Sequence, residues 1–415
     1  MAMRAHAYRG DPAARILARP LTSDPYPIYE QARAAGLVTR SSLGPLFVTA
    51  SHRVVGQALR DPRLGVLTFP YRLTDTVQPV EDSFLMKNPP DHTRLRRLVA
   101  PWFTGRAIQQ RRTDVARVVD RTLDDLAGRP GFDVVQDFAL PVAVRVICDL
   151  IGLPEGHERR LAGWGAMLSL SLDRVRTLKQ RRRMQDSLAD MDRFFAGVIE
   201  RGEAPSGSVL AALMDTAGDP QMLTRRDVVA TSGLLLLAGF ETVVGLIGSA
   251  AWHLLHDREL RVRALGDPAM MTGLVEETLR HEPPVQYTIR RVNEPYEVDG
   301  VQLPRNSQIL LLLAAASRDP DVFENPQRFL PTRPNSRDHL AFSGGVHYCI
   351  GAGLARMEAE VALGTLFRRL PGLAPGGEPG WYQLRNLRSL RTLPVTVGGD
   401  PSPSDHDAVT TRRYL

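Results

Sequence analysis

Cys349 lies between a glycine-rich turn and a predicted helix, an arrangement that could activate a thiol. The stretch around it reads Phe342-Ser343-Gly344-Gly345-Val346-His347-Tyr348-Cys349-Ile350-Gly351, and residues 350–370 have the pattern of a helix. Backbone N–H groups and the positive end of the dipole at a helix start favour a thiolate over a thiol. Glycines permit a tight turn and let a flat group approach the backbone closely. These features are compatible with a metal site, a nucleophile or a structural role for Cys349.

A second chemical signal lies inside a long apolar run, residues 228–255, where the chain reads Ala238-Gly239-Phe240-Glu241-Thr242. A glycine inside a helix costs about 1 kcal/mol relative to alanine, and a threonine in mid-helix can bend the helix. Together they could open a groove for a small molecule, or the helix could simply pack against a close neighbour. The run is long enough to cross a bilayer, but Glu241 would be costly at bilayer depth. We therefore expect a core helix of a large soluble domain.

One pair of charged side chains has a spacing that suits ion pairing. Glu277 and Arg280 stand at positions i and i+3 of a predicted helix, so they can pair on one face. Taken alone, such a pair is most often an exposed salt bridge.

Taken together, these motifs resemble those of the cytochrome P450 family. Every signature position of the family's haem-ligand loop, Phe-x-x-Gly-x-His-x-Cys-x-Gly, is filled between Phe342 and Gly351. Residues 238–242 resemble the family's oxygen-binding segment, and residues 277–280 resemble its Glu-x-x-Arg motif. The resemblance covers nearly the whole chain, with the motifs in the family's order. One departure is Ser343, where the family usually has glycine.

The resemblance implies a site built around haem b, iron protoporphyrin IX. Cys349 would be the axial ligand of the iron, and Glu241 and Thr242 would form an acid–alcohol pair that delivers protons during dioxygen reduction. The two propionates of haem call for cations in fixed places, preferably arginine. The implied structural ion-pair network comprises Glu277, Arg280 and Arg333. The residues assigned to cofactor binding are His92, Arg96, Ala238, Gly239, Arg290, Phe342, Gly345, His347, Cys349 and Gly351.

By the same resemblance, the chain is a monooxygenase that hydroxylates or epoxidises a medium-sized, largely apolar molecule of secondary metabolism, such as a terpenoid, polyketide or peptide antibiotic. Its electrons would come from a ferredoxin and an NAD(P)H-dependent ferredoxin reductase. Two alternatives stay open: a haem-thiolate enzyme of oxidative coupling or peroxygenation, and a non-catalytic P450-like partner protein. Residues expected near the substrate, each equally compatible with packing, are Phe84, Leu85, Met86, Leu234, Leu235, Val285, Gln286, Tyr287 and Thr288.

Composition indicates an ordinary soluble protein, with 43% hydrophobic and 24% charged residues among 415. Cys148 and Cys349 are the only cysteines, so we expect no disulfide framework and a cytoplasmic location. The net charge of +6 comes from dispersed arginines, and the dense run at 181–183 is expected to be a solvated helix face. We therefore expect a monomer with no nucleic-acid partner, no signal peptide and no membrane anchor.

The elements that must position these residues are mostly helices. We expect a mainly α fold with small β-sheets, one large domain over residues 20–398, and haem between the long central helix and the helix after Cys349. A flexible N-terminus is expected over 1–19, a long loop over 64–90 and a disordered tail over 399–415. Predicted helices cover 28–35, 51–59, 91–126, 138–151, 158–172, 175–200, 208–216, 224–256, 259–265, 270–281 and 350–370, and predicted strands cover 46–49, 285–292, 296–298, 308–313 and 392–397.

Overall fold

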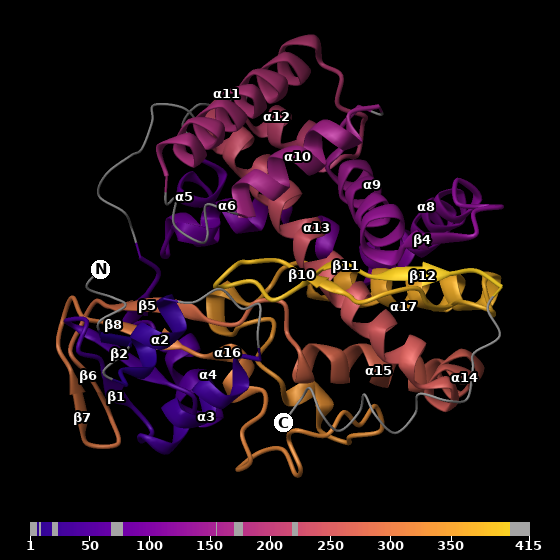
Figure 1. Cartoon of the computed structure of the whole chain (residues 1–415). Coiled ribbons are helices and arrows are strands. Elements are labelled where there is room, and N and C mark those ends of the chain that lie inside the picture. The colour runs from indigo at the N-terminus through magenta and orange to yellow at the C-terminus, as the bar shows by residue number, and fades with distance from the viewer. Residues whose placement is uncertain are drawn as a thin grey trace.

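A single long helix, α13 (Arg225–His256), crosses the centre of the molecule (Figure 1). The computed structural model describes residues 6–7, 10–18, 24–67, 78–154, 156–169, 177–217 and 223–398. α13 starts at a capping box in which Thr224 and Asp227 exchange side-chain to backbone hydrogen bonds. Within the described ranges it is the one helix long and apolar enough to span a membrane, and 78% of that apolar window is buried inside the protein. It is therefore a core helix, as its sequence predicts.

Other helices pack along α13 on both sides. The helices that contact it include η3 (Val134–Ala139), a stretch of π-helix, and α5, α9, α10, α15 and α17. The remaining helical bounds are α2 (Pro12–Ala18), α3 (Tyr26–Ala34), α4 (His52–Arg60), α5 (Pro79–Asp82), η1 (Phe84–Met86), α6 (Asp91–Val99), η2 (Ala100–Phe103), α7 (Gly105–Gln110), α8 (Arg112–Asp124), α9 (Leu140–Ile151), α10 (Glu158–Ser169), α11 (Leu178–Arg201), α12 (Val209–Thr216), α14 (Arg258–Gly266), α15 (Pro268–His281), α16 (Leu313–Ala316), η5 (Ser336–Asp338), η6 (Gly345–His347) and α17 (Ala352–Arg369).

Small sheets flank the helical part, and the five-stranded sheet lies beside α2, α3 and α4 (Figure 1). Its strand order is β1-β2-β8-β5-β3, with β2 and β8 parallel and the other neighbours antiparallel. A second sheet has the order β4-β12-β9, and β6–β7 and β10–β11 are hairpins. The strand bounds are β1 (Thr39–Arg40), β2 (Leu46–Thr49), β3 (Leu64–Gly65), β4 (Gly131–Asp133), β5 (Thr288–Val292), β6 (Tyr296–Val298), β7 (Val301–Leu303), β8 (Gln308–Leu311), β9 (Ala374–Pro375), β10 (Gly380–Trp381), β11 (Leu390–Thr392) and β12 (Pro394–Thr396).

The predicted mainly α fold with small sheets is confirmed, but several boundaries differ. The helix predicted over 91–126 is divided into α6, η2, α7 and α8, because Pro101 lacks the N–H that would continue the ladder. The predicted strand 285–292 starts only at Thr288, after the pair Pro283-Pro284, and Val285 makes a single isolated bridge to Leu387.

Segments expected to lack regular structure are partly ordered. Residues 64–90, expected to be a loop, include β3, α5 and η1, while residues 68–77 lie outside the described ranges. The N-terminal stretch expected to be flexible includes α2, whose Ala13 and Ile16 are buried in a core cluster with Tyr29. The tail over 399–415 lies outside the described residues.

Candidate functional site

The cysteine loop between η6 and α17 is held by its own backbone and by α4. The Cys349 N–H donates to the Phe342 carbonyl at 2.9 Å, which closes the loop. Gly345 has φ +63°, and a Cβ there would lie 2.3 Å from the carbonyl oxygen of Leu59, so only glycine fits. Ser343 also has φ +63°. The position where the resemblance expects glycine therefore has a backbone conformation that glycine favours.

The Cys349 side chain is accessible to solvent, yet protein groups surround it. Burial raises the pKa of its thiol, while a hydrogen bond from the Gly351 N–H and the charges of Arg96 and Arg356 act in the opposite direction. The loop thus provides one N–H donor to the sulfur, but the desolvation of the thiolate outweighs it. A metal ion bound to the sulfur would supply the missing positive charge.

One turn of α13 is open, whereas the helix on either side of it is buried. Ala238 is exposed, and Gly239, Glu241 and Thr242 are half-buried. The Thr242 hydroxyl donates to the Ala238 carbonyl at 3.1 Å, the back-bond typical of threonine in mid-helix. A Cβ on Gly239 would lie 2.6 Å from Ile147 of α9, so the close approach that this glycine permits is that of a neighbouring helix. For Gly239 the structure therefore agrees with close packing against a neighbouring helix rather than with a groove for a small molecule.

The charge of Glu241 acts on Tyr382, which follows β10 of the hairpin β10–β11. Burial, and then the charge of Glu241, raises the pKa of Tyr382. One turn along α13, a Cβ on Gly245 would lie 3.0 Å from the hydroxyl of Ser389, whose carbonyl accepts the Tyr382 N–H at 3.1 Å.

Two histidines from distant segments meet near the cysteine loop. His92 of α6 is buried, its ring centroid lies 4.3 Å from that of His347, and neither of its ring nitrogens has a partner. The Nε2 of His347 is also buried and without a partner. Burial, together with the charges of Arg290, His92 and Arg96, lowers the pKa of His347 to about 3. The two rings therefore present neutral, unsatisfied polar atoms.

Two arginines add buried positive charge to the same region. Arg290 of β5 is buried, which lowers its pKa to about 10, and its printed hydrogen bonds include one to Thr288. Arg96 donates to the Tyr348 carbonyl at 2.6 Å. In the described part of the chain no carboxylate pairs with either arginine. Buried cations without counter-ions are costly, so this cluster fits a ligand with carboxylate groups, such as the propionates of haem.

Glu277, Arg280 and Arg333 form a buried network behind the site. Arg280 makes a two-point pair with Glu277, with both N–O distances 2.7 Å, and Arg333 lies 3.3 Å from the same carboxylate. The Leu330 N–H donates to Glu277 at 2.8 Å. The other N–H groups of Arg280 and Arg333 donate to carbonyls of residues 317–328. The network therefore connects α15 to the irregular segment before the cysteine loop.

The residues expected near the substrate divide into open and buried positions. Leu85 is exposed and Met86 is half-buried, both in η1, whereas Phe84 is buried beside the ring of His92. Leu234 and Leu235 are buried one turn before the open turn of α13. Val285 is half-buried.

Gln286 and Tyr287, also expected near the substrate, have buried side chains in the structure. The Gln286 amide donates to the Pro283 carbonyl and its oxygen accepts from the Tyr29 hydroxyl at 2.9 Å, so its polar atoms are used in the core. Tyr287 packs in the N-terminal core cluster with Tyr29. The segment between Pro284 and β5 is irregular, whereas its residue pattern predicts a strand from residue 285. Thr288 instead accepts a hydrogen bond from Arg290.

Sequence reasoning missed three residues close to the site. Tyr382 is the neighbour of Glu241 described above, and Glu276 pairs with Arg356 beside the cysteine loop. Arg356 has a signal in the sequence, since it stands near the start of the helix that follows Cys349. Glu276 stands beside Glu277, which has the more obvious motif spacing. Tyr382 follows a short strand that has no periodic pattern.

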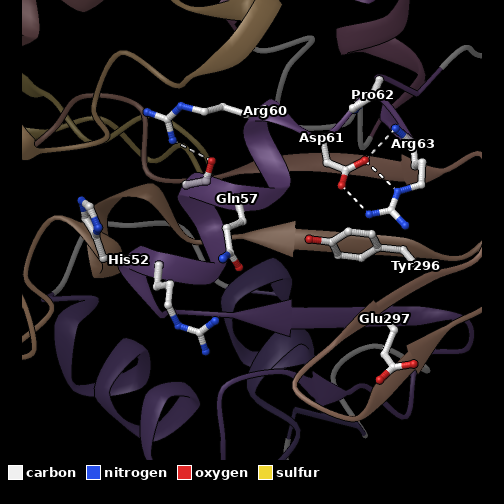
Figure 2. Close-up of a pocket in the computed structure, with 10 residues that line it drawn as sticks. His52, Gln57, Arg60, Asp61, Pro62, Arg63, Tyr296 and Glu297 are labelled. Atoms are coloured by element: carbon white, nitrogen blue, oxygen red, sulfur yellow. Dashed lines mark hydrogen bonds and ion pairs between the residues drawn. The ribbon is translucent and has the colours of Figure 1, made fainter.

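A groove of about 750 Å³ lies elsewhere, along α4 and the hairpin β6–β7 (Figure 2). Its charged walls are satisfied within the protein. Arg63 pairs with Asp61 and lies 4.8 Å above the Tyr296 ring, and Arg60 donates to the Gly56 carbonyl (Figure 2). None of the predicted site residues lines it, although Arg60 at its wall lies against Gly344 and Gly345 of the cysteine loop.

Comparisons with known proteins agree with the motifs. The family model for cytochrome P450 matches residues 176–380. A putative cytochrome P450 140 of Mycobacterium tuberculosis is 36% identical over 409 residues, which cover 94% of this chain and 93% of the relative. The cytochrome P450 monooxygenase PikC of Streptomyces venezuelae is 33% identical, over 91% of this chain and 92% of the relative. The structure of P450BioI in complex with an acyl carrier protein that bears hexadec-9Z-enoic acid has a TM-score of 0.83 at 32% identity, over 90% and 98% of the two chains. The chain therefore belongs to the cytochrome P450 family.

Proposed function

We propose that the protein is a haem-thiolate monooxygenase that hydroxylates or epoxidises a medium-sized, largely apolar molecule of secondary metabolism. One set of observations carries the proposal: the protein has an accessible cysteine, an open turn in α13 and, among the described residues, a cluster of the arginines Arg290 and Arg96 without counter-ions beside the unsatisfied rings of His92 and His347. A nucleophilic cysteine would have no use for such cations. The family supports monooxygenase chemistry, and relatives such as PikC and 6-deoxyerythronolide B hydroxylase carry that activity in their names.

Haem b is the cofactor that we infer. Cys349 would hold the iron, and the propionates would be met by the otherwise unsatisfied rings of His92 and His347 and by the buried charge of Arg290. When haem is bound, its thiolate ligand donates electron density to the iron, which favours cleavage of the O–O bond. The exposed Ala238 leaves space at the open turn of α13.

Thr242 and Glu241 would move protons at this turn. The Thr242 hydroxyl keeps its own proton in a bond to the Ala238 carbonyl and can accept another hydrogen bond from the site. Glu241, at the edge of hairpin β10–β11, links the open turn to the region around Tyr382. The helix on either side of this turn is apolar and buried, which limits the access of water to a proton relay.

An apolar substrate of macrolide or fatty-acyl size is the class that we infer. Leu85, Met86 and Val285 offer partly open apolar surface near the site. Similar structures were solved with hexadec-9Z-enoic acid on a carrier protein, with testosterone and with epothilone D, at 25–32% identity.

A ferredoxin with its NAD(P)H-dependent reductase is the electron source that we infer, for a cytoplasmic monomer. Val346 and Tyr348 of the cysteine loop expose 52% and 43% of their surface, and Arg94 and Arg97 of α6 are exposed. Apolar side chains surrounded by arginines suit a small acidic electron-transfer protein.

The test uses purified holoenzyme. Reduction under carbon monoxide should give the Soret band of thiolate-ligated haem, and spin-state titrations with hexadec-9Z-enoic acid, testosterone and a macrolide should identify a binding class. Turnover of the tightest binder with a surrogate ferredoxin system under labelled dioxygen should place one labelled atom in the product. Turnover with peroxide alone, or coupled products without label, would favour the second function. A relative at 28% identity and TM-score 0.82, CxnD, catalyses C–S bond formation and keeps that alternative in view. The absence of a haem spectrum would refute both functions and leave a non-catalytic partner protein.

A further inference from the structure

Arg356 contacts the cysteine loop at both of its ends. Its guanidinium carbon lies 4.6 Å from the centre of the Phe342 ring, at the start of the loop. The same group donates a hydrogen bond to the Tyr348 hydroxyl, just before Cys349. Because the Phe342 carbonyl accepts the Cys349 N–H, both contacts act on the residues that hold the sulfur in place.

Glu276 of α15 fixes the orientation of Arg356. The carboxylate is buried, and it accepts from Arg356 Nε at 2.7 Å and from Nη2 at 3.1 Å, a two-point pair. Burial acts to raise the pKa of Glu276, but hydrogen bonds from His339 and Arg356 lower it to about 2, so the carboxylate stays charged. The charge of an arginine held in this way is little screened by solvent, and its side chain stays beside the loop.

Glu276 also contacts the segment that precedes the cysteine loop, through His339. The Ala341 N–H donates to His339 Nδ1 at 3.2 Å, so Nδ1 is an acceptor and the ring proton is on Nε2. That Nε2–H then donates to Glu276 at 3.2 Å. Glu276 therefore joins α15, α17 and the segment that enters the cysteine loop.

Arg356 stacks on Phe342, whose carbonyl accepts the Cys349 N–H, so its positive charge lies close to the sulfur. A fixed positive charge near a thiolate attracts its electron density and stabilises whichever redox state of the ligated metal carries more negative charge. For an iron–thiolate unit this is the ferrous state. Removing the charge should therefore lower the reduction potential.

We propose that Arg356, held by Glu276, is a positioning residue that sets the electron-donating strength of Cys349 and thereby the reduction potential of the iron. The inference rests on the proposed function, because it requires haem on Cys349. It does not require knowledge of the substrate.

The chain offers a matched control. Arg337 also pairs with Glu276, at 3.3 Å, but its side chain is 71% exposed, and the structure shows no contact between its charge and Phe342, Tyr348 or Cys349. Replacing Arg337 removes one cation from the same carboxylate without touching the loop. A purely structural role of the Glu276 cluster would give similar effects for both arginines.

The experiment is a spectroelectrochemical titration of the substrate-free holoenzyme and its variants R356Q, R356K and R337Q. R356Q should lower the ratio of ferrous to ferric enzyme at a given potential about tenfold, a shift of about 59 mV to more negative values. R356K should shift less in the same direction, because it keeps a charge but cannot form the two-point pair or stack on Phe342. R337Q should leave the potential unchanged.

Equal potentials for wild type, R356Q and R356K would overturn the proposal, and so would a shift of the same size in R337Q. If R356Q does not retain haem, R356K and R337Q still decide the question by the same comparison. A wild-type protein without a thiolate-ligated haem spectrum would instead refute the proposed function. A normal wild-type spectrum with an unresponsive potential refutes only the role of Arg356.

Discussion

Replacing Glu277 by glutamine should cost the folded protein several kcal/mol. Glu277 accepts two hydrogen bonds from Arg280, one from Arg333 and one from the Leu330 N–H, all without access to solvent. In Glu277→Gln one oxygen becomes an NH₂ donor that faces guanidinium donors, so at least two charge-assisted hydrogen bonds are lost. At about 1.5–3 kcal/mol each, the loss is roughly 3–6 kcal/mol. Breaking a buried pair costs about 3–5 kcal/mol, which agrees.

The assay is urea unfolding of the holoenzyme, followed both by helical circular dichroism and by haem absorbance. The matched control is Arg53→Gln, which breaks an ion pair of similar length, 2.6 Å to Asp299, whose side chains are 51% and 35% exposed. That variant should lose less than about 1 kcal/mol. Equal free energies of unfolding for Glu277→Gln and Arg53→Gln would refute the reasoning, because the buried network would then contribute no more than a surface pair.

Three further outcomes are expected. Cys349→Ser should lose the thiolate-type Soret band completely, whereas Cys148→Ser should keep it, since Cys148 is a buried thiol of raised pKa on α9; loss of the band in both would contradict the ligand assignment. Ser343→Gly should stabilise the protein by about 1 kcal/mol in the same urea titration, because Ser343 has a positive φ and its hydroxyl is buried without a partner; a lower stability would count against this. Burial raises the pKa of Glu358 in the folded protein well above its usual range. As pH rises above about 4, Glu358 therefore ionises more readily in the unfolded chain than in the folded protein, and the free energy of unfolding falls. Glu358→Gln should therefore gain stability over wild type by up to about 1.4 kcal/mol per pH unit over that range and match it at low pH; a constant difference at all pH values would show that ionisation is not the cause.

The parts of the site that are contiguous in sequence could be predicted, because their chemistry and spacing occur in one stretch. The cysteine loop and the open turn of α13 are of this kind. The cation cluster is different, since His92, Arg290 and His347 come from a helix, a strand and a loop that only the fold brings together. Without the family resemblance, each of these residues would have been interpreted as a surface cation.

The differences between predicted and observed elements have local physical causes. The family resemblance places Gln286 and Tyr287 near the substrate, whereas the pairing of β5 starts only after them, at Thr288. Their side chains are used instead by Tyr29 and the N-terminal core, contacts that link residues far apart in sequence. Glu276 and Arg356 meet across two helices, and single-helix patterns carry no information about such a pair.

The parallel pairing of β2 with β8 determines the order in which the molecule can be completed during synthesis. Leu46 pairs with Gln308, so the first long strand of the chain waits for most of the polypeptide before its neighbour exists. Contacts between such distant segments slow folding, and unpaired strand edges that wait for a partner are prone to aggregation. Arg290 lies on β5, the other neighbour of β8, and Cys349 is synthesised later still. The helices around α13 can pack early, but capture of the cofactor must follow release of nearly the whole chain from the ribosome.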